Sequence, residues 1–117
     1  MAMAEETLAS GKITIDPEVL ETIARMTTLA VPGVARLTAP LGIQRMLGLK
    51  DGIQIAIHAD RTVTVNLHVV VESGRNMLAL GRQIQSEVTR AIEDIAGMEV
   101  EAVNVYIEDV VPTAEED

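Results

Sequence analysis

Alternating apolar and polar residues predict two adjacent strands in the middle of the chain. Apolar residues occupy every second position of 53–57 and again of 63–71, which is the period of a half-buried strand. Both apolar sets face one side of a hairpin only when the numbers of paired residues sum to an even value. A three-residue loop at 59–61 satisfies this condition and pairs Ile57 with Val63. The pattern therefore predicts an antiparallel hairpin in that register.

A helix is predicted before the hairpin, from Asp16 to about Ala30. Asp16 is a favourable N-cap, and Pro17 suits the first helical position. Pro32 and Gly33 follow the helix and favour a turn. The spacing of its apolar residues predicts a buried face made of Val19 or Leu20, Ile23, Met26 or Thr27, and Ala30.

A longer helix is predicted after the hairpin, from about Asn76 to Ala96. Its apolar residues recur at the spacing of one buried stripe. That stripe consists of Met77, Leu80, Ile84, Val88, Ala91, Ile92 and Ile95. Gly97 follows in the position where glycine commonly ends a helix. Gly81 lies inside the helix and costs about 1 kcal/mol relative to alanine, so we expect another element to pack closely there.

The other segments have less regular patterns. Residues 12–15 are predicted to form a short strand before the first helix, and 99–111 a long last strand. The apolar phase of the last strand shifts midway, which indicates either a β-bulge near Ala102 and Val103 or burial of both faces. Residues 34–50 are partly apolar but are interrupted by proline and glycine. Short helical turns or a mobile insert are both consistent with that segment.

These elements predict a single α+β domain over residues 11–111. The order is β-α-β-β-α-β with a weak first strand. Two helices cover one face of a three- to four-stranded mixed sheet, which gives a two-layer sandwich. Residues 1–10 are expected to be a disordered tail and residues 112–117 an acidic tail. A chain of 117 residues that is 48% hydrophobic suits one such core.

The net charge of −9 is unevenly distributed along the chain. Residues 1–90 hold nine acids and nine bases, whereas 91–117 hold nine acids and no base. Four bases and no acid lie between Glu21 and Asp51, namely Arg25, Arg36, Arg45 and Lys50. The chain is therefore a charge dipole along its sequence. Its negative charge and its single aromatic residue, Tyr106, argue against nucleic-acid binding.

The sequence predicts no enzymatic activity, no cofactor and no metal site. There is no cysteine, which excludes thiolate chemistry and the usual structural zinc sites. The hairpin register places His58 and His68 about 20 Å apart, too far to share a metal, and no serine lies beside either histidine. The N-terminal residues do not resemble a signal peptide, and no apolar run is long enough to span a bilayer. We therefore expect a cytoplasmic protein.

Two predicted surfaces favour association with another protein. One is the sheet face turned away from the helices, which is mixed in polarity and poor in charge. The other consists of two oppositely charged parts of the chain, the basic stretch and the acidic end, which favour head-to-tail contacts between copies. The alternative is that the charge separation serves no contact with another molecule. The candidate residues of these surfaces are Arg36, Arg45, Lys50, Glu93, Asp94, Glu99, Glu101, Asn104 and Tyr106. The alternative function is a small anion- or metabolite-binding domain that uses the basic 34–50 segment.

A series of short motifs runs in order along residues 11–110. The motifs are Gly11-Lys12-Ile13, Val31-Pro32-Gly33-Val34, Gly52-Ile53-Gln54-Ile55, Val65-Asn66-Leu67-His68-Val69-Val70-Val71, Gln85-Ser86-Glu87-Val88, Gly97-Met98-Glu99-Val100 and Val103-Asn104-Val105-Tyr106-Ile107. In this order and spacing, the chain resembles the alkaline shock protein family, which comprises envelope-stress-response proteins typical of Gram-positive bacteria.

The resemblance implies a non-enzymatic protein of cell-envelope homeostasis that self-assembles or acts as an adaptor. It also implies a location at the cytoplasmic face of the membrane, by way of a small membrane-anchored partner protein. The family has no established catalytic residues, so the resemblance assigns none to this chain.

Overall fold

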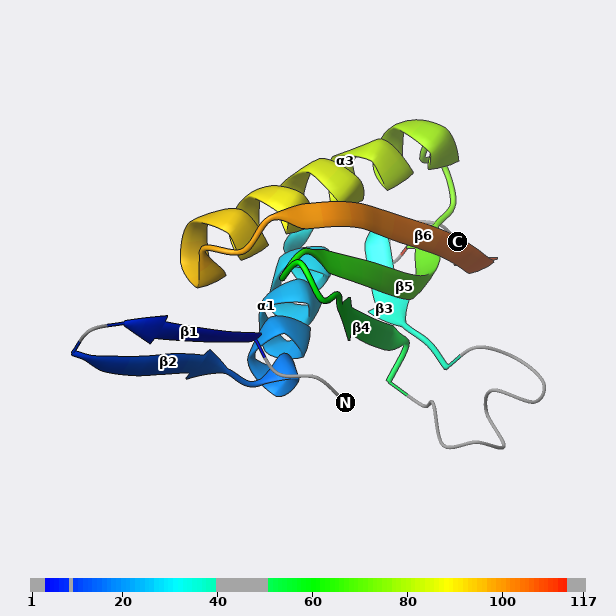
Figure 1. The fold of residues 1–117 in the computed structure, drawn as a ribbon. Coiled ribbons are helices and arrows are strands. Elements are labelled where there is room, and N and C mark those ends of the chain that lie inside the picture. The colour runs from blue at the N-terminus through cyan, green and yellow to red at the C-terminus, as the bar shows by residue number, and fades with distance from the viewer. Residues whose placement is uncertain (1–3, 9, 40–50, 114–117) are drawn as a thin grey trace.

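The structure, a computed structural model, describes residues 4–8, 10–39 and 51–113 (Figure 1). The elements in chain order are β1 (Ala4–Leu8), β2 (Gly11–Ile15), α1 (Pro17–Ala30), β3 (Val34–Leu37), β4 (Ile53–Ile57), β5 (Val63–Glu72), α3 (Met77–Ala91), η1 (Ile92–Ala96) and β6 (Val100–Val111). The last helical segment, η1, is a π-helical turn that continues α3. Two helices pack on one face of a four-stranded mixed sheet, which confirms the predicted two-layer α+β sandwich.

Strand β5 is the centre of the main sheet and pairs with its three other strands. Strand β6 runs parallel to it along one edge, from Val63 to Glu72. On the other edge, β4 pairs antiparallel with residues 63–67 and β3 pairs antiparallel with residues 69–71. Strands β3 and β4 therefore follow one another along the same edge of β5.

The β4–β5 hairpin has the register predicted from the sequence. Ile57 pairs with Val63, and the ladder continues in that register along both strands. Arg61 ends the connecting loop with a φ of 67°, the left-handed conformation that three-residue hairpin loops use. The register places the apolar residues of both strands on the side of the helices.

Helix α1 begins and ends where the sequence predicts. Oδ1 of Asp16 accepts a hydrogen bond of 2.9 Å from the Glu18 N–H, and Pro17 takes the first helical position. The buried residues are Pro17, Leu20, Ile23, Ala24 and Thr28. Of the predicted alternatives Met26 and Thr27, Thr27 is half-buried and Met26 is 67% exposed, whereas the predicted burial of Ala30 is wrong. The side of the helix that faces the sheet carries Leu20, Ala24 and Thr28, which are four residues apart. Met26 lies on another side of the helix and is therefore exposed.

The second predicted helix is built from α3 and η1. Oδ1 of Asn76 caps it by accepting a hydrogen bond of 2.9 Å from the Ala79 N–H, and Gly97 ends it with a φ of 70°. The predicted burial of Ile95 is wrong, since this side chain is 71% exposed. A π-turn holds more residues than an α-turn, so it moves Ile95 away from the buried stripe. Met77, also expected to be buried, is 44% exposed in the first turn.

Gly81 lies in the middle of α3 without a close neighbour. A Cβ atom at this position meets no heavy atom within 4 Å. The expectation of an element packed closely against Gly81 is therefore wrong for the described part of the chain. This glycine weakens the helix without serving its packing.

The hydrophobic core lies between the helices and one face of the sheet. Every second residue of β5 is completely buried, namely Val63, Val65, Leu67, Val69 and Val71. The helices cover these side chains with Leu20, Ala24, Ile84, Val88 and Ile92, which are also completely buried. Burying one such aliphatic side chain contributes about 1.5–3 kcal/mol, so this seam supplies most of the driving force for folding.

Two β-bulges in β6 explain the phase shift of the last strand. Glu101 and Glu108 have no paired residue on β5, so each is an extra residue on β6. The first bulge lies immediately before the position predicted at Ala102 and Val103. It returns Val103 to the helix side, where this residue is buried.

Residues 4–8, expected from the sequence to belong to a disordered tail, form strand β1 instead. This strand pairs with β2 in a separate two-stranded hairpin that stands away from the main sheet (Figure 1). The strand predicted at 12–15 is present as β2, with β1 as its partner. Backbone pairing between the two strands orders a segment that has no apolar periodicity.

Residues 34–37, for which the sequence indicates short helical turns or a mobile insert, form β3 instead. The strand has four residues and a register shift between Val34 and Arg36, so it is too short and irregular to show a period of two. Residues 40–50 and 114–117 lie outside the described residues. The remaining expectations for the insert and for the acidic tail stay predictions.

Candidate association surfaces

The sheet face turned away from the helices carries mainly polar side chains, and we call it the open face. It is made of Gln54, Ala56, Thr64, Asn66, His68, Asn104 and Tyr106. Nδ2 of Asn104 donates a hydrogen bond of 2.8 Å to Oδ1 of Asn66, because the parallel register sets these residues side by side. Near the hairpin loop, Nε2 of His58 lies 2.7 Å from Oγ1 of Thr64. Side-chain bonds thus cross-link neighbouring strands on this face.

A histidine, a tyrosine and a glutamate form a connected cluster on the open face. Nδ1 of His68 lies 2.6 Å from Oε2 of Glu108, and only 8% of His68 is exposed. The ring of Tyr106 stacks on that of His68 with centroids 4.7 Å apart and 12° between the planes. Tyr106 is 47% exposed, so it presents one apolar ring on a mostly polar face.

Four predicted acidic residues lie on η1, immediately before β6 and near its start, and we call them the acidic end. They are Glu93, Asp94, Glu99 and Glu101, and all four are exposed. Oε2 of Glu101 lies 3.2 Å from Nε2 of His58. Glu101 therefore borders the β4–β5 loop, and the expected role of these four residues in association stays a prediction.

The predicted basic partner of this acidic end is only partly described. Arg36 lies on β3, in the same row of the sheet as Val70 of β5 and Asp109 of β6. Arg45 and Lys50 lie outside the described residues. Arg36 and Asp109 thus lie in one row of the sheet with β5 between them. The anion-binding alternative stays a prediction.

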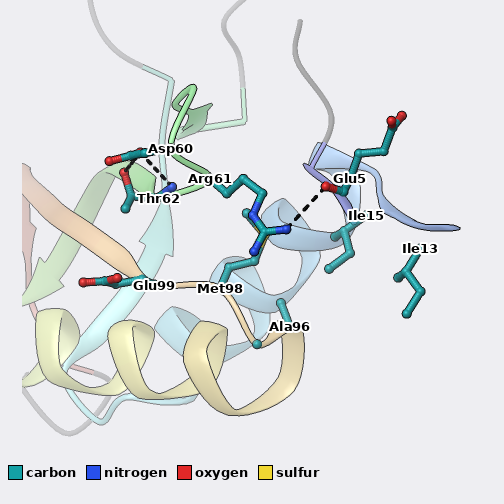
Figure 2. Close-up of a pocket in the computed structure, with 10 residues that line it drawn as sticks. Glu5, Ile13, Ile15, Asp60, Arg61, Thr62, Ala96, Met98 and Glu99 are labelled. Carbon is teal, nitrogen blue, oxygen red and sulfur yellow. Dashed lines mark hydrogen bonds between the residues drawn. The ribbon is translucent and has the colours of Figure 1, made fainter. Parts of the chain in front are cut away.

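A cleft of about 550 Å³ separates the β1–β2 hairpin from the rest of the domain (Figure 2). Ile13 and Ile15 line its hairpin side, and Met98 lines the opposite side. Figure 2 shows the Arg61 side chain reaching across to the hairpin, where Nη1 donates to the backbone O of Glu5 at 3.5 Å. The hairpin is therefore tethered near its base, while Ile13 stays 56% exposed.

Asp60 borders the same cleft in the β4–β5 loop. Its Oδ1 accepts hydrogen bonds from the hydroxyl of Thr62 at 2.7 Å and from the N–H of Thr62 at 3.1 Å. These bonds favour the ionised carboxylate and lower the pKa of Asp60, the hydroxyl bond contributing most. The charged form of Asp60 therefore stabilises the loop.

Two shallow grooves lie along the helices. One, of about 530 Å³, runs between the C-terminal part of α1 and the α3–η1 helix and is bordered by Met26, Arg90 and Ile95. The other, of about 360 Å³, runs between α3 and β6. It is lined by Met77, Leu78, Gly81, Arg82, Gln85, Val105 and Ile107. Both grooves combine exposed apolar side chains with a charged rim.

The described residues contain no group of three or more acidic or histidine side chains that could hold a metal ion. The His58 N–H donates a hydrogen bond to the Thr62 carbonyl, and the His68 N–H donates one to the Gly52 carbonyl. The two histidines therefore lie at opposite ends of the hairpin, as predicted. Within the same part of the chain, no helix has the length and apolar character needed to cross a membrane.

Sequence reasoning missed two features of these surfaces. The first is the pairing of His68 with Glu108, which are 40 residues apart. The alternation of apolar and polar residues around Glu108 predicts that it belongs to a strand but not which residue lies beside it. The β-bulge that brings Glu108 beside His68 depends on the parallel register of β5 and β6. The second is Ile13 as part of a projecting hairpin, and the alternation of Ile13 and Ile15 with polar neighbours was the available signal.

The described residues form a small α+β domain with an open sheet face and shallow grooves along its helices. Over residues 5–112 the sequence matches the alkaline shock protein 23 family, described as having a cell envelope-related function. The protein Spy1535 of Streptococcus pyogenes is 30% identical over 103 residues, which cover 86% of this chain and 80% of the relative. YqhY of Bacillus subtilis is 24% identical over 112 residues, covering 92% and 82%. The chain belongs to this family, which confirms the resemblance.

Solved structures of MamM-CTD share the fold. One has a TM-score of 0.51 and 13% sequence identity, and the similarity covers 80% of this chain and 98% of that chain. A second has the same TM-score and identity and is covered to 99%. At this identity the similarity concerns the fold alone.

Proposed function

We propose that this chain is a non-enzymatic module of cell-envelope homeostasis and stress response that self-associates and acts as an adaptor. The observation that carries the proposal is the exposure of large apolar side chains that the core does not use. They are Ile13 at 56%, Met26 at 67%, Leu78 at 65% and Ile95 at 71%. Met26 and Ile95 border one groove and Leu78 lines another, and apolar side chains gathered at a groove support contacts with other protein surfaces. The cell envelope-related function of the family supports the setting.

Electrostatics supports contact between unlike ends of two copies. The acidic end holds four exposed carboxylates, and the basic residues Arg36, Arg45 and Lys50 are the proposed partners in a second copy. Contacts between different patches on identical molecules propagate into rings or filaments. Because exposed charges are screened within about 8–10 Å at ordinary ionic strength, salt weakens this association.

The adaptor role places the module at the cytoplasmic face of the membrane through a membrane-anchored partner protein. A net charge of −9 disfavours direct adsorption to an anionic lipid surface. Recruitment therefore requires a protein contact. The test is flotation with vesicles: anionic vesicles alone leave the chain in solution, and direct binding to such vesicles contradicts the partner-dependent mechanism.

Static light scattering over a concentration series tests self-association. At low salt the molar mass should rise above 12.6 kDa with concentration and fall back when salt is added. Replacing Asp94 and Glu99 by Lys should reduce the association at low salt, whereas the control Glu21→Lys on α1 should not. A constant mass of one chain at high concentration and low salt contradicts the proposal.

A further inference from the structure

Strand β6 has an outer edge that no other strand of the described chain covers. It pairs with β5 on one side only. The Val103 carbonyl accepts a hydrogen bond of 3.0 Å from Nε2 of Gln85, which shows that the backbone of Val103 faces outward. Since backbone groups alternate along a strand, those of Val105 and Ile107 face outward as well. An uncovered edge of this kind is a template for another strand.

The usable part of this edge is short and uncharged. The bulges at Glu101 and Glu108 interrupt the regular ladder, and bulges commonly end strand pairing. The residues between the bulges, 102–107, carry no charge, while acids stand at both ends and Asp109 is exposed. The edge therefore fits a strand of about five residues that brings a base and no acid.

A groove on the helix side of this edge has room for an apolar side chain. Leu78 is 65% exposed and Met77 is 44% exposed along its α3 wall, and Val105 and Ile107 form the β6 wall. Between them, a Cβ at Gly81 would meet nothing within 4 Å. Gly81 lines this groove, so its missing side chain leaves room there for an apolar group from another chain.

We propose that the outer edge of β6 binds strand β2 from the hairpin of a second copy of this chain. The inference rests on the proposed self-association and names the strand contact without which the attraction between the charged patches does not hold two copies together. Strand β2 has five residues, Gly11–Ile15, which matches the length of the regular edge. Its outer edge pairs with no other strand of the described chain.

The alternation of β2 fits both sides of the site. Ile13 and Ile15 lie on one face of the strand and Lys12 on the other. With this face toward the helices of the second copy, Ile13 enters the groove at Gly81, while Ile15 stays packed against the core of its own chain. Lys12 then lies on the open-face side, where the flanking carboxylates of β6 attract it. Lys12 is 3.6 Å from Glu5 in the isolated chain, an exposed pair that contributes little and is easily exchanged.

Charge complementarity selects β2 rather than β1 as the bound strand. Strand β1 carries Glu5 and Glu6, which the acids beside the β6 edge repel, whereas β2 carries Lys12 and no acid. Docking also supports a hairpin that projects from the domain (Figure 1), since two-stranded hairpins are marginally stable alone. Each copy offers one hairpin and one edge, so the contact joins unlike surfaces and propagates.

Mixing two complementary variants of the full chain tests the proposal. Ile13→Glu disables the hairpin and leaves the edge intact, whereas Val105→Pro disables the edge and leaves the hairpin intact. The proline removes an N–H that faces away from β5, which an edge strand tolerates. Each variant alone should have the mass of one chain by light scattering. Their mixture should form a complex of one copy of each, because one intact hairpin meets one intact edge.

Further variants keep the test independent of folding defects. Leu78→Glu, at an exposed position of α3, replaces Val105→Pro if circular dichroism shows the proline variant unfolded. Gly81→Ala should weaken association at least about tenfold while the helix becomes more stable. Val19→Glu changes a 48% exposed valine on α1, which belongs neither to β2 nor to the groove between α3 and β6, and should associate like the wild type.

The outcomes separate this inference from the proposed function. A one-to-one complex in the mixture supports the pairing of hairpin and edge. Wild-type association that survives Ile13→Glu or the edge variant overturns it and leaves self-association standing. Variants that fail singly and also fail to combine overturn it as well. A wild-type chain that never associates overturns the proposed function and this inference together.

Discussion

Thr28 is completely buried in α1, and its hydroxyl has no hydrogen-bond partner in the described structure. An unsatisfied buried hydroxyl costs about 1–3 kcal/mol. Thr28→Val keeps the shape and removes the polar atom, so it should raise the free energy of unfolding by about 1 kcal/mol in urea denaturation. The control Thr22→Val removes an exposed hydroxyl that bonds to Glu18 and should change stability little. A destabilised Thr28→Val variant contradicts this account of Thr28.

Asp60 gives the loop between β4 and β5 a pH dependence. Its pKa is lowered in the folded chain by the bonds from Thr62. Its stabilising contribution is therefore present above the unfolded pKa of about 4 and is lost as the pH falls through the folded pKa. The stability difference between the wild type and Asp60→Ala should shrink as the pH falls below about 4. Urea denaturation at a series of pH values measures it.

A matched variant and a contrary outcome complete the test of Asp60. Thr62→Val removes the hydroxyl donor and keeps the N–H donor, so it should reduce this pH dependence without abolishing it. A difference between wild type and Asp60→Ala that stays constant over the acid range would falsify the assigned role of the carboxylate.

The two glycines Gly52 and Gly81 show how differently one residue type acts in two elements. Gly52 has a φ of +76°, and a Cβ there would lie 2.5 Å from the Thr38 carbonyl O and 3.0 Å from that of His68. It stands where β3 and β4 meet on the edge of β5. Gly81 sits in a regular helix with open space around it.

Alanine at these two positions should therefore have opposite effects on stability. Gly52→Ala should lower the free energy of unfolding by about 3 kcal/mol, because backbone atoms must move and the positive φ is strained. Gly81→Ala should raise it by about 1 kcal/mol through helix propensity. Thermal and urea denaturation measure both, and a shift of the same sign in the two variants contradicts this assignment.

Elements with strong periodicity were predictable, and elements defined by their partners were not. The parity of Ile57 and Val63 fixed the central hairpin, and Asp16 and Gly97 marked helix ends. Strand β3 is too short for a pattern, and β1 is ordered by pairing with β2. The exposure of Ile95 was not predicted because the π-turn changes the helical period locally. Sequence periodicity reports burial along one element, whereas these features depend on contacts between elements.

At the scale of the whole molecule, folding rearranges a charge pattern that looks simple in the sequence. Glu93, Asp94, Glu99 and Glu101 are all exposed, and their role in association stays a prediction. Parallel pairing of β5 with β6 nevertheless carries Asp109 to the row of Arg36. The predicted surfaces could thus be assigned to residues but not to positions in space, since the crossover decides which charges become neighbours.

The elongated shape follows from one projecting element. The principal extents are 61, 31 and 19 Å, and the hairpin extends beyond the two-layer domain (Figure 1). A projecting hairpin and an uncovered edge on the same molecule are complementary parts of one contact. They make self-association the central expectation for this chain.

The molar mass measured by sedimentation equilibrium over a wide concentration range tests that expectation most directly. At low salt we expect the weight-average mass to rise continuously above 12.6 kDa, because a contact between unlike surfaces adds copies without closing a pair, and added salt should lower it. A mass that stays at 12.6 kDa across the whole range would contradict the account.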